Sequence, residues 1–286
     1  MLVIIGYLLA LGCIFGGYML HGGNIQIILK ALPIEMMVIG GGALGAFVVN
    51  NQTKVIKATL RNLPGALKGS VHTKKSYLEL MALLFDILQK ARKEGLMSIE
   101  QDVDAPNESK LFQSYPNIVK DHHLTEFLTD YLRMMVSGNL NSYEIEALID
   151  SELETHHQES HAPIAAIARV AAGLPAFGIV AAVLGVINTM GSVGQPPAVL
   201  GAMIGSALVG TFLGILLAYG VVEPLGGLME QQAEDRSKQF LCVKATLLAS
   251  MQGYNPTTCV EFGRKVLFST ERPTFSEMEV HVRAKR

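Results

Sequence analysis

Residues that could bind or pass a proton are almost missing from the apolar parts of this sequence. Residues 2–29 and 170–222 contain no Asp, Glu, Lys or Arg. Glu35, His21 and Arg169 lie in or beside these runs, and we place all three near helix ends, where a long side chain can reach water. Ionisable groups deep in a membrane are costly and usually mark ion routes. A chain with none at mid-depth would need another polypeptide to supply the titratable group.

Uncharged polar residues and prolines are the groups that the apolar runs do offer. The polar ones are Asn188, Thr189, Ser206, Thr211 and Tyr219. They could line a wet path or bond their own helix backbone, and their spacing leaves both alternatives open. Pro175 leaves the carbonyl of Ala171 without its helical donor, which predicts a kink and a polar point inside the membrane. Pro224 either ends the last apolar run or forms a hinge.

Close helix contact is predicted by the spacing of small residues. Gly201 and Gly205, and then Gly210 and Gly214, are four apart in one apolar run. Glycines at this spacing let two helix backbones approach each other in lipid.

The polar segments show no clear pattern for metal binding or catalysis. His156, His157 and His161 include a pair four residues apart, but no third ligand has a convincing spacing, so we expect no metal site.

The mixed charges between Lys90 and Asp102 are typical of a solvated face, or of a weak and salt-sensitive partner contact. No nucleotide loop, GxSxG elbow or HExxH pattern occurs, so we expect neither enzymatic activity nor a cofactor. Three scattered cysteines predict no disulfide.

Composition indicates a chain divided between two solvents. Of 286 residues, 50% are hydrophobic and only 17% are charged, whereas soluble domains average about a quarter charged. The net charge of -2 provides no excess of Lys and Arg, which argues against a nucleic-acid partner.

Four apolar segments approach or exceed the roughly 20 residues that a helix needs to cross a bilayer. We place them at residues 2–20, 34–51, 168–190 and 199–222. The first lacks the positive n-region of a cleaved signal peptide, so we expect it to be retained. The sequence therefore predicts an all-α polytopic membrane protein with four transmembrane helices.

Lys and Arg gather after the second segment and after the fourth, which predicts that these regions and both termini are cytoplasmic. The resulting domains are residues 1–51 (helices 1 and 2), 52–165 (a large cytoplasmic helical loop), 166–223 (helices 3 and 4) and 224–286 (a cytoplasmic helical tail). Within the loop, apolar residues at helical spacing predict helices from Tyr77 and from Leu124, and Ser142 is a candidate helix cap. The periodicity from Met229 to Gly253 would extend the fourth helix.

Several segments together resemble one known family. They are Gly6-Tyr-Leu-Leu-Ala-Leu-Gly, Tyr143-Glu-Ile-Glu-Ala-Leu-Ile-Asp, Leu174-Pro-Ala-Phe-Gly-Ile-Val, Val209-Gly-Thr-Phe-Leu-Gly and Val260-Glu-Phe-Gly-Arg-Lys. Over nearly its whole length the chain is similar to the MotA family of flagellar stator proteins, within the wider group of MotA, TolQ and ExbB proton channels.

The resemblance implies a stator subunit in the bacterial inner membrane. It implies a MotB partner whose single membrane helix supplies the ion-binding aspartate, a rotor protein FliG that receives the torque, and a homo-oligomeric ring of five chains. It also implies protons as the coupling ion, in preference to sodium.

Site residues follow from the same resemblance. Arg92 and Glu100 match the family's charged pair that faces the rotor. Pro175 matches the proline beside the ion-binding aspartate, Pro224 the proline at the foot of the last span, and Thr211 a pore-side hydroxyl. We assign Tyr219 to the same ion pathway.

Three other functions stay open at this point. An energiser of the ExbB or TolQ type would have three spans and an N-terminus outside the cytoplasm. A free-standing transporter would need an internal ion site, and a structural scaffold would need no ion at all.

Overall fold

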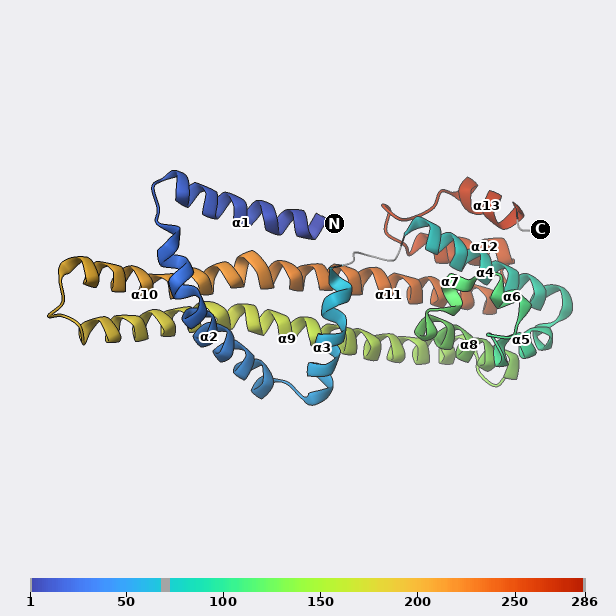
Figure 1. Ribbon diagram of the computed structural model, residues 1–286. Helices are drawn as coiled ribbons and strands as arrows, with labels where there is room; N and C mark the ends of the chain where they lie inside the picture. Colours follow the sequence, from blue (N-terminus) through green and yellow to red (C-terminus); the bar gives the residue numbers. More distant parts are fainter. Residues whose placement is uncertain (1, 68–72, 285–286) are drawn as a thin grey trace. The chain divides into compact units, whose positions relative to one another are not determined.

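The computed structural model describes residues 2–67 and 73–284, with the backbone alone for 282–284. Within these residues every regular element is helical (Figure 1), and the chain divides into two compact units. We call residues 1–69 with 159–232 the apolar unit, and residues 70–158 with 233–286 the polar unit. Two long helices, α9 (Ser142–Met190) and α11 (Glu223–Met251), contribute residues to both units.

The apolar unit contains the membrane helices. Its other elements are α1 (Leu2–Leu20), α2 (Ile25–Asn50), α3 (Thr53–Ala66), α10 (Pro197–Leu217) and the π-helix η2 (Ala218–Val222). In the described part of the chain, four helical stretches are long and apolar enough to cross a membrane: Leu2–Leu20, Ile25–Asn50, Ser142–Met190 and Pro197–Met251. The prediction of four membrane helices is confirmed, as is the extension of the fourth into the tail.

The second membrane helix begins nine residues before the predicted start at residue 34, so that boundary was wrong. Asn24 caps α2, because its side-chain oxygen accepts a hydrogen bond from the Gln26 amide at 3.0 Å. Lys30 is exposed and Pro33 lies inside the helix. A lysine can extend its ammonium toward water, and membrane helices tolerate proline, so neither residue ends the helix.

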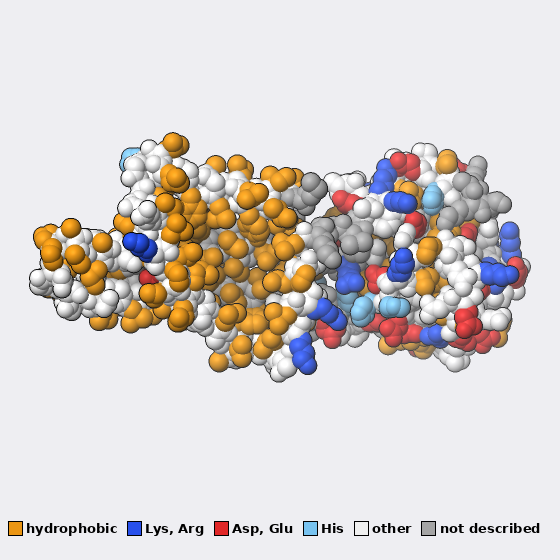
Figure 2. Space-filling model, in the orientation of Figure 1, with side chains coloured by type: hydrophobic (Ala, Val, Ile, Leu, Met, Phe, Trp, Pro, Cys, Tyr) orange, Lys and Arg blue, Asp and Glu red, His pale blue; other side chains and the backbone are white. Residues whose placement is uncertain are grey.

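Aliphatic side chains from three helices form the core of the apolar unit. They include Ile28, Ile39 and Ala43 of α2, Leu174 and Ala181 of α9, and Val209 and Leu213 of α10. No residue of α1 is buried, although Phe15 meets Phe212 edge to face with ring centroids 5.9 Å apart. Hydrophobic side chains also cover the surface of this unit (Figure 2), as expected for residues that face lipid or other chains.

The polar unit has a closed hydrophobic core of its own. Its elements are α4 (Lys74–Glu94), η1 (Leu96–Ile99), α5 (Glu100–Asp104), α6 (Lys110–Gln113), α7 (Pro116–Val119), α8 (His122–Ser137), α12 (Pro256–Lys265) and α13 (Phe275–Ala284), with the polar parts of α9 and α11. The predicted apolar faces are buried, with Leu80, Leu84, Leu124, Leu128 and Val243 almost fully enclosed. Asn141, rather than Ser142, caps α9, since its side chain accepts from the Tyr143 and Glu144 amides.

Candidate functional site

Helices α9 and α10 pack backbone against backbone in the apolar unit. A Cβ atom built on Gly178 would lie 2.8 Å from the Gly210 carbonyl oxygen, and one on Gly214 would lie 2.8 Å from the Cα of Gly178. Neither position accepts a side chain without movement. The close contact predicted from Gly210 and Gly214 is confirmed, whereas a Cβ on Gly201 would meet nothing within 4 Å.

Glu35 of α2 lies against this pair of helices. A Cβ on Gly210 would lie 2.6 Å from Oε2 of Glu35 and 3.0 Å from the Cβ of Ala181. The Glu35 side chain is only 7% exposed, and its Oε2 has no hydrogen-bond partner among the residues that the structure describes. The placement of Glu35 near a helix end was therefore wrong. It followed from starting α2 too late, and the burial of Glu35 against Gly210 has no signal in the sequence spacing.

Pro175 and Thr211 lie on neighbouring turns of the paired helices. Pro175 follows Leu174, whose carbonyl oxygen would lie 2.8 Å from a Cβ on Gly214, and Thr211 follows Gly210. Both side chains are half-buried. Since α9 continues through Pro175, the missing amide leaves one carbonyl without its helical donor. The third span thus offers a freed carbonyl and the fourth span a hydroxyl, while the second span brings the Glu35 carboxylate to Gly210, the residue before Thr211.

Thr189, another of the polar residues in the spans, bonds to the backbone of its own helix. The Thr189 hydroxyl donates to the Gly185 carbonyl oxygen at 2.9 Å, four residues back on its own helix. For Thr189 the structure therefore decides between the two alternatives in favour of backbone bonding.

Tyr219 lies within an irregular turn, and Pro224 follows that turn. Residues 218–222 form the π-helix η2, and Pro224 is the second residue of α11. Proline cannot donate to the carbonyl four residues back and its ring crowds that carbonyl, which favours a wider turn. The Tyr7 hydroxyl of α1 donates to the Val221 carbonyl oxygen at 2.9 Å. Tyr219 itself is 59% exposed.

Arg92 and Glu100 are both exposed on the polar unit. Arg92 lies in the last turn of α4, Glu100 begins α5, and between them Gly95 takes a positive φ of 90°, which glycine adopts readily. Neither makes an ion pair with another described residue, whereas Lys90 and Asp102 pair with each other at 2.7 Å. Leu96 and Met97 are exposed on the same turn. The segment from Lys90 to Asp102 therefore contains one internal ion pair and an exposed surface of mixed apolar and charged side chains.

His156 lies beside a cavity in the polar unit. The His156 ring packs against Phe240 with centroids 4.6 Å apart, beside a cavity of about 290 Å³ that His123, Glu126, Asp130 and Glu152 also line. No group of three or more His, Cys, Asp or Glu side chains suited to a metal ion occurs among the residues that the structure describes.

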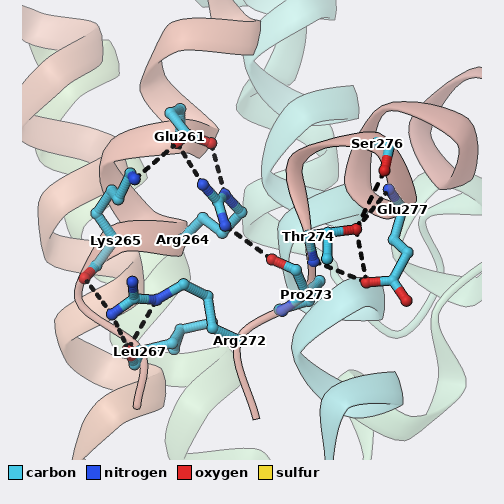
Figure 3. Close-up of polar contacts among 9 residues, drawn as sticks. All are labelled: Glu261, Arg264, Lys265, Leu267, Arg272, Pro273, Thr274, Ser276 and Glu277. Atoms are coloured by element: carbon cyan, nitrogen blue, oxygen red, sulfur yellow. Dashed lines mark hydrogen bonds and ion pairs between the residues drawn. The ribbon is translucent and has the colours of Figure 1, made fainter. Parts of the chain in front are cut away.

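A buried arginine organises the end of the polar unit (Figure 3). The Arg264 guanidinium donates two hydrogen bonds of 2.6 Å to Glu261 and one of 2.8 Å to the Pro273 carbonyl. This arrangement lowers the pKa of Glu261 and raises that of Arg264, chiefly through their hydrogen bonds. Arg272 donates to the Leu267 carbonyl at 2.7 Å. The tail segment from Val260 to Lys265 therefore has a structural role.

Comparisons with known proteins decide the family. The family described as Motility protein A N-terminal matches residues 4–95, and the MotA/TolQ/ExbB proton channel family matches residues 119–241. The chain is 48% identical over 286 residues to motility protein A of Salmonella typhimurium, covering 100% of this chain and 96% of that protein. This chain belongs to the MotA family. Motility protein A of Escherichia coli is 49% identical over 284 residues, covering 99% of this chain and 96% of that protein.

Solved structures show the same MotA fold. The MotAB structure from C. jejuni matches with a TM-score of 0.77 at 22% identity, over 95% of this chain and 98% of that one. The MotAB stator complex of Bacillus subtilis matches with a TM-score of 0.72 at 24% identity, over 90% and 92%. The N-terminal MotA match and the four candidate spans favour this family over an ExbB or TolQ energiser.

Proposed function

We propose that this chain is the MotA subunit of a flagellar stator, which works with a MotB partner to convert proton flow into torque on the rotor. The observation that carries the proposal is the identity of nearly half of all positions with two motility proteins over the full length. A match of this extent includes both the spans and the polar unit. A non-enzymatic role in the bacterial inner membrane, with both termini in the cytoplasm, follows from the same proposal.

The partner's aspartate is the group that we expect to take the proton from outside. Two solved relatives are complexes of MotA with MotB, which supports the same assembly here. We propose that Pro175, Thr211, Tyr219 and Pro224 lie along the ion pathway, with Pro175 beside the aspartate. Neutralising that aspartate would remove a charge from the ring interior and let the ring move to its next position.

The energy available suits stepwise movement. One elementary charge that crosses 100 mV releases about 2.3 kcal/mol. That is enough to shift a ring between similar positions but too little to break a large interface. We propose a ring of five chains, with protons rather than sodium as the coupling ion, and with Arg92 and Glu100 facing the rotor protein FliG.

Complementation tests the proposal. The gene for this chain would be expressed with its MotB-type partner in a strain without stators, and swimming would be measured on soft agar and by cell tracking. We expect swimming to return, and to stay absent when the partner's aspartate is replaced by asparagine. Normal membrane insertion of both proteins without any swimming would overturn the proposal.

A further inference from the structure

Glu35 is buried in the apolar unit without the neighbours that usually stabilise a carboxylate. At 7% exposure it faces Gly210 and Ala181, which carry no polar side-chain atoms, and within the described part of the chain its Oε2 has no hydrogen-bond partner. A buried charge of this kind is costly unless a proton or a polar partner compensates it.

Counts along three helices place this carboxylate deep in the bilayer. Glu35 is ten residues from the start of α2, Ala181 is nine from the end of α9, and Gly210 is thirteen from the start of α10. At 1.5 Å per residue these separations are about 14 to 20 Å. Since the hydrocarbon core is about 30 Å thick, each count places its residue near the middle of that core.

No titratable side chain from α9 or α10 can serve Glu35, because residues 170–217 contain no Asp, Glu, Lys, Arg, His, Cys or Tyr. On α2 itself Lys30 is exposed. On α1, the Tyr7 hydroxyl donates to the Val221 carbonyl and the Tyr18 hydroxyl to that of Asn24, while Cys13 is exposed. The described surroundings of Glu35 are thus apolar.

We propose that Glu35 is a proton-exchanging residue of this chain, a second titratable group in addition to the aspartate of the partner. The carboxylate takes a proton on Oε2 to become a neutral carboxyl, and then returns that proton to the pathway. Gly210 leaves the space that the carboxyl occupies. This inference rests on the proposed function, because it adds a step to the same proton route.

Substitutions at Glu35 separate proton exchange from packing. Glu35→Gln keeps the size of the side chain and an acceptor oxygen but cannot take up a proton. We expect proton flux through the complex, and swimming speed, to fall about tenfold or more, while the complex with the partner still purifies. Glu35→Asp should retain more proton flux and more swimming speed than Glu35→Gln. Wild-type flux in Glu35→Gln would overturn the proposal, and so would loss of the complex in that variant, since the carboxylate would then be structural.

Two glycine substitutions on α10 form a matched pair. Gly210→Ala brings a Cβ to 2.6 Å from Oε2, whereas Gly201→Ala enters open space. We expect a loss of flux in Gly210→Ala alone, and partial recovery when Glu35→Asp shortens the carboxyl side chain in the same protein. Equal flux in both glycine variants would contradict the role given to Gly210.

Infrared spectroscopy gives a readout that does not depend on motility. The complex would be studied in membranes at pH 7, with the partner's aspartate replaced by asparagine. We expect a protonated-carboxyl C=O band that shifts in D₂O and disappears in Glu35→Gln. A band that persists in that variant, or no band at all, would overturn the inference. If the wild-type chain and its partner restored no swimming but this band were present, the stator proposal alone would fail.

Discussion

At the scale of single residues, Pro175 allows a direct test of the ion pathway. Alanine would restore an amide that can donate to the Ala171 carbonyl and would remove this free acceptor from the membrane. We expect Pro175→Ala to leave expression and partner binding intact and to reduce swimming speed several-fold. Cell tracking with partner co-purification measures both effects. Normal motility would remove Pro175 from the proposed path.

Arg264 is the residue whose loss should most weaken the polar unit. It is 8% exposed and donates to Glu261 and Pro273, whereas the neighbouring Lys265 is 62% exposed on its side chain. Replacing a buried hydrogen-bonded charge costs about 1–3 kcal/mol, so Arg264→Gln should lower the free energy of unfolding by that amount. Lys265→Gln is the matched control and should have little effect.

A buried thiol close to Arg264 in sequence provides the measurement. Burial raises the pKa of Cys259 to about 11, so its reactive thiolate is scarce near neutral pH while the unit is folded. Alkylation of Cys259 in membranes across a urea series should therefore report local unfolding. Arg264→Gln should react at lower urea than the wild type. Identical curves for Arg264→Gln and Lys265→Gln would refute the structural role of Arg264.

At the scale of elements, an ion pair fastens α13 to the start of α4. Lys74 Nζ lies 2.7 Å from Glu277, which also accepts from the Thr274 amide. The hydrogen bond from Lys74 and those from Thr274 lower the pKa of Glu277 to about 2. A carboxyl whose pKa is lowered by folding stabilises the folded state above its unfolded pKa, and the effect is lost as the pH falls through the folded pKa.

Attachment of α13 should therefore weaken between about pH 4.5 and pH 2. Hydrogen exchange of the α13 amides, compared between wild type and Glu277→Gln at each pH, measures the effect. We expect faster exchange in Glu277→Gln at pH 6 and convergence of the two proteins near pH 2. Equal protection at pH 6 would show that this pair contributes nothing.

The turn between α4 and α5 is the element that we expect to meet the rotor. Reversing Arg92 or Glu100 should weaken motility, and an opposite reversal on the rotor protein should restore part of it, as expected for charges paired across an interface. Lys110→Glu, an exposed reversal on α6, serves as the control. If neither Arg92→Glu nor Glu100→Arg changed swimming speed, the turn between α4 and α5 would be an ordinary solvated face.

Helices with long apolar runs or regular periodicity could be predicted from the sequence, and elements set by tertiary contacts could not. The faces of α4 and α8 were visible in the spacing of their leucines. The start of α2 was missed because Lys30 and Pro33 resemble breakers, although a membrane helix tolerates both. The π-helix η2 and the short helices α5 to α7 have no periodicity to detect.

The same limit applies to the candidate site. Pro175, Pro224 and the paired glycines could be identified in the chain because their backbone effects are local. The burial of Glu35 could not, because it depends on which face of α2 meets Gly210, which lies 175 residues later in the chain on another helix. Its position corrects the expectation that the spans lack a titratable group at mid-depth.

At the scale of the whole molecule, the presence of Glu35 does not make the chain self-sufficient. A single carboxyl enclosed by glycine and alanine can hold a proton but offers no continuous route for one. The chain therefore still requires a partner that supplies an aspartate beside Pro175. During its passage the proton would then meet two carboxyls, one from each protein.

Proton flux in liposomes tests this central claim most directly. A pH-sensitive dye inside the vesicles would report flux under an imposed potential, for the purified chain alone, for its complex with the partner, and for the complex whose aspartate is replaced by asparagine. We predict flux from the intact complex and none above background from the other two. Steady proton flux through the chain alone would contradict the account.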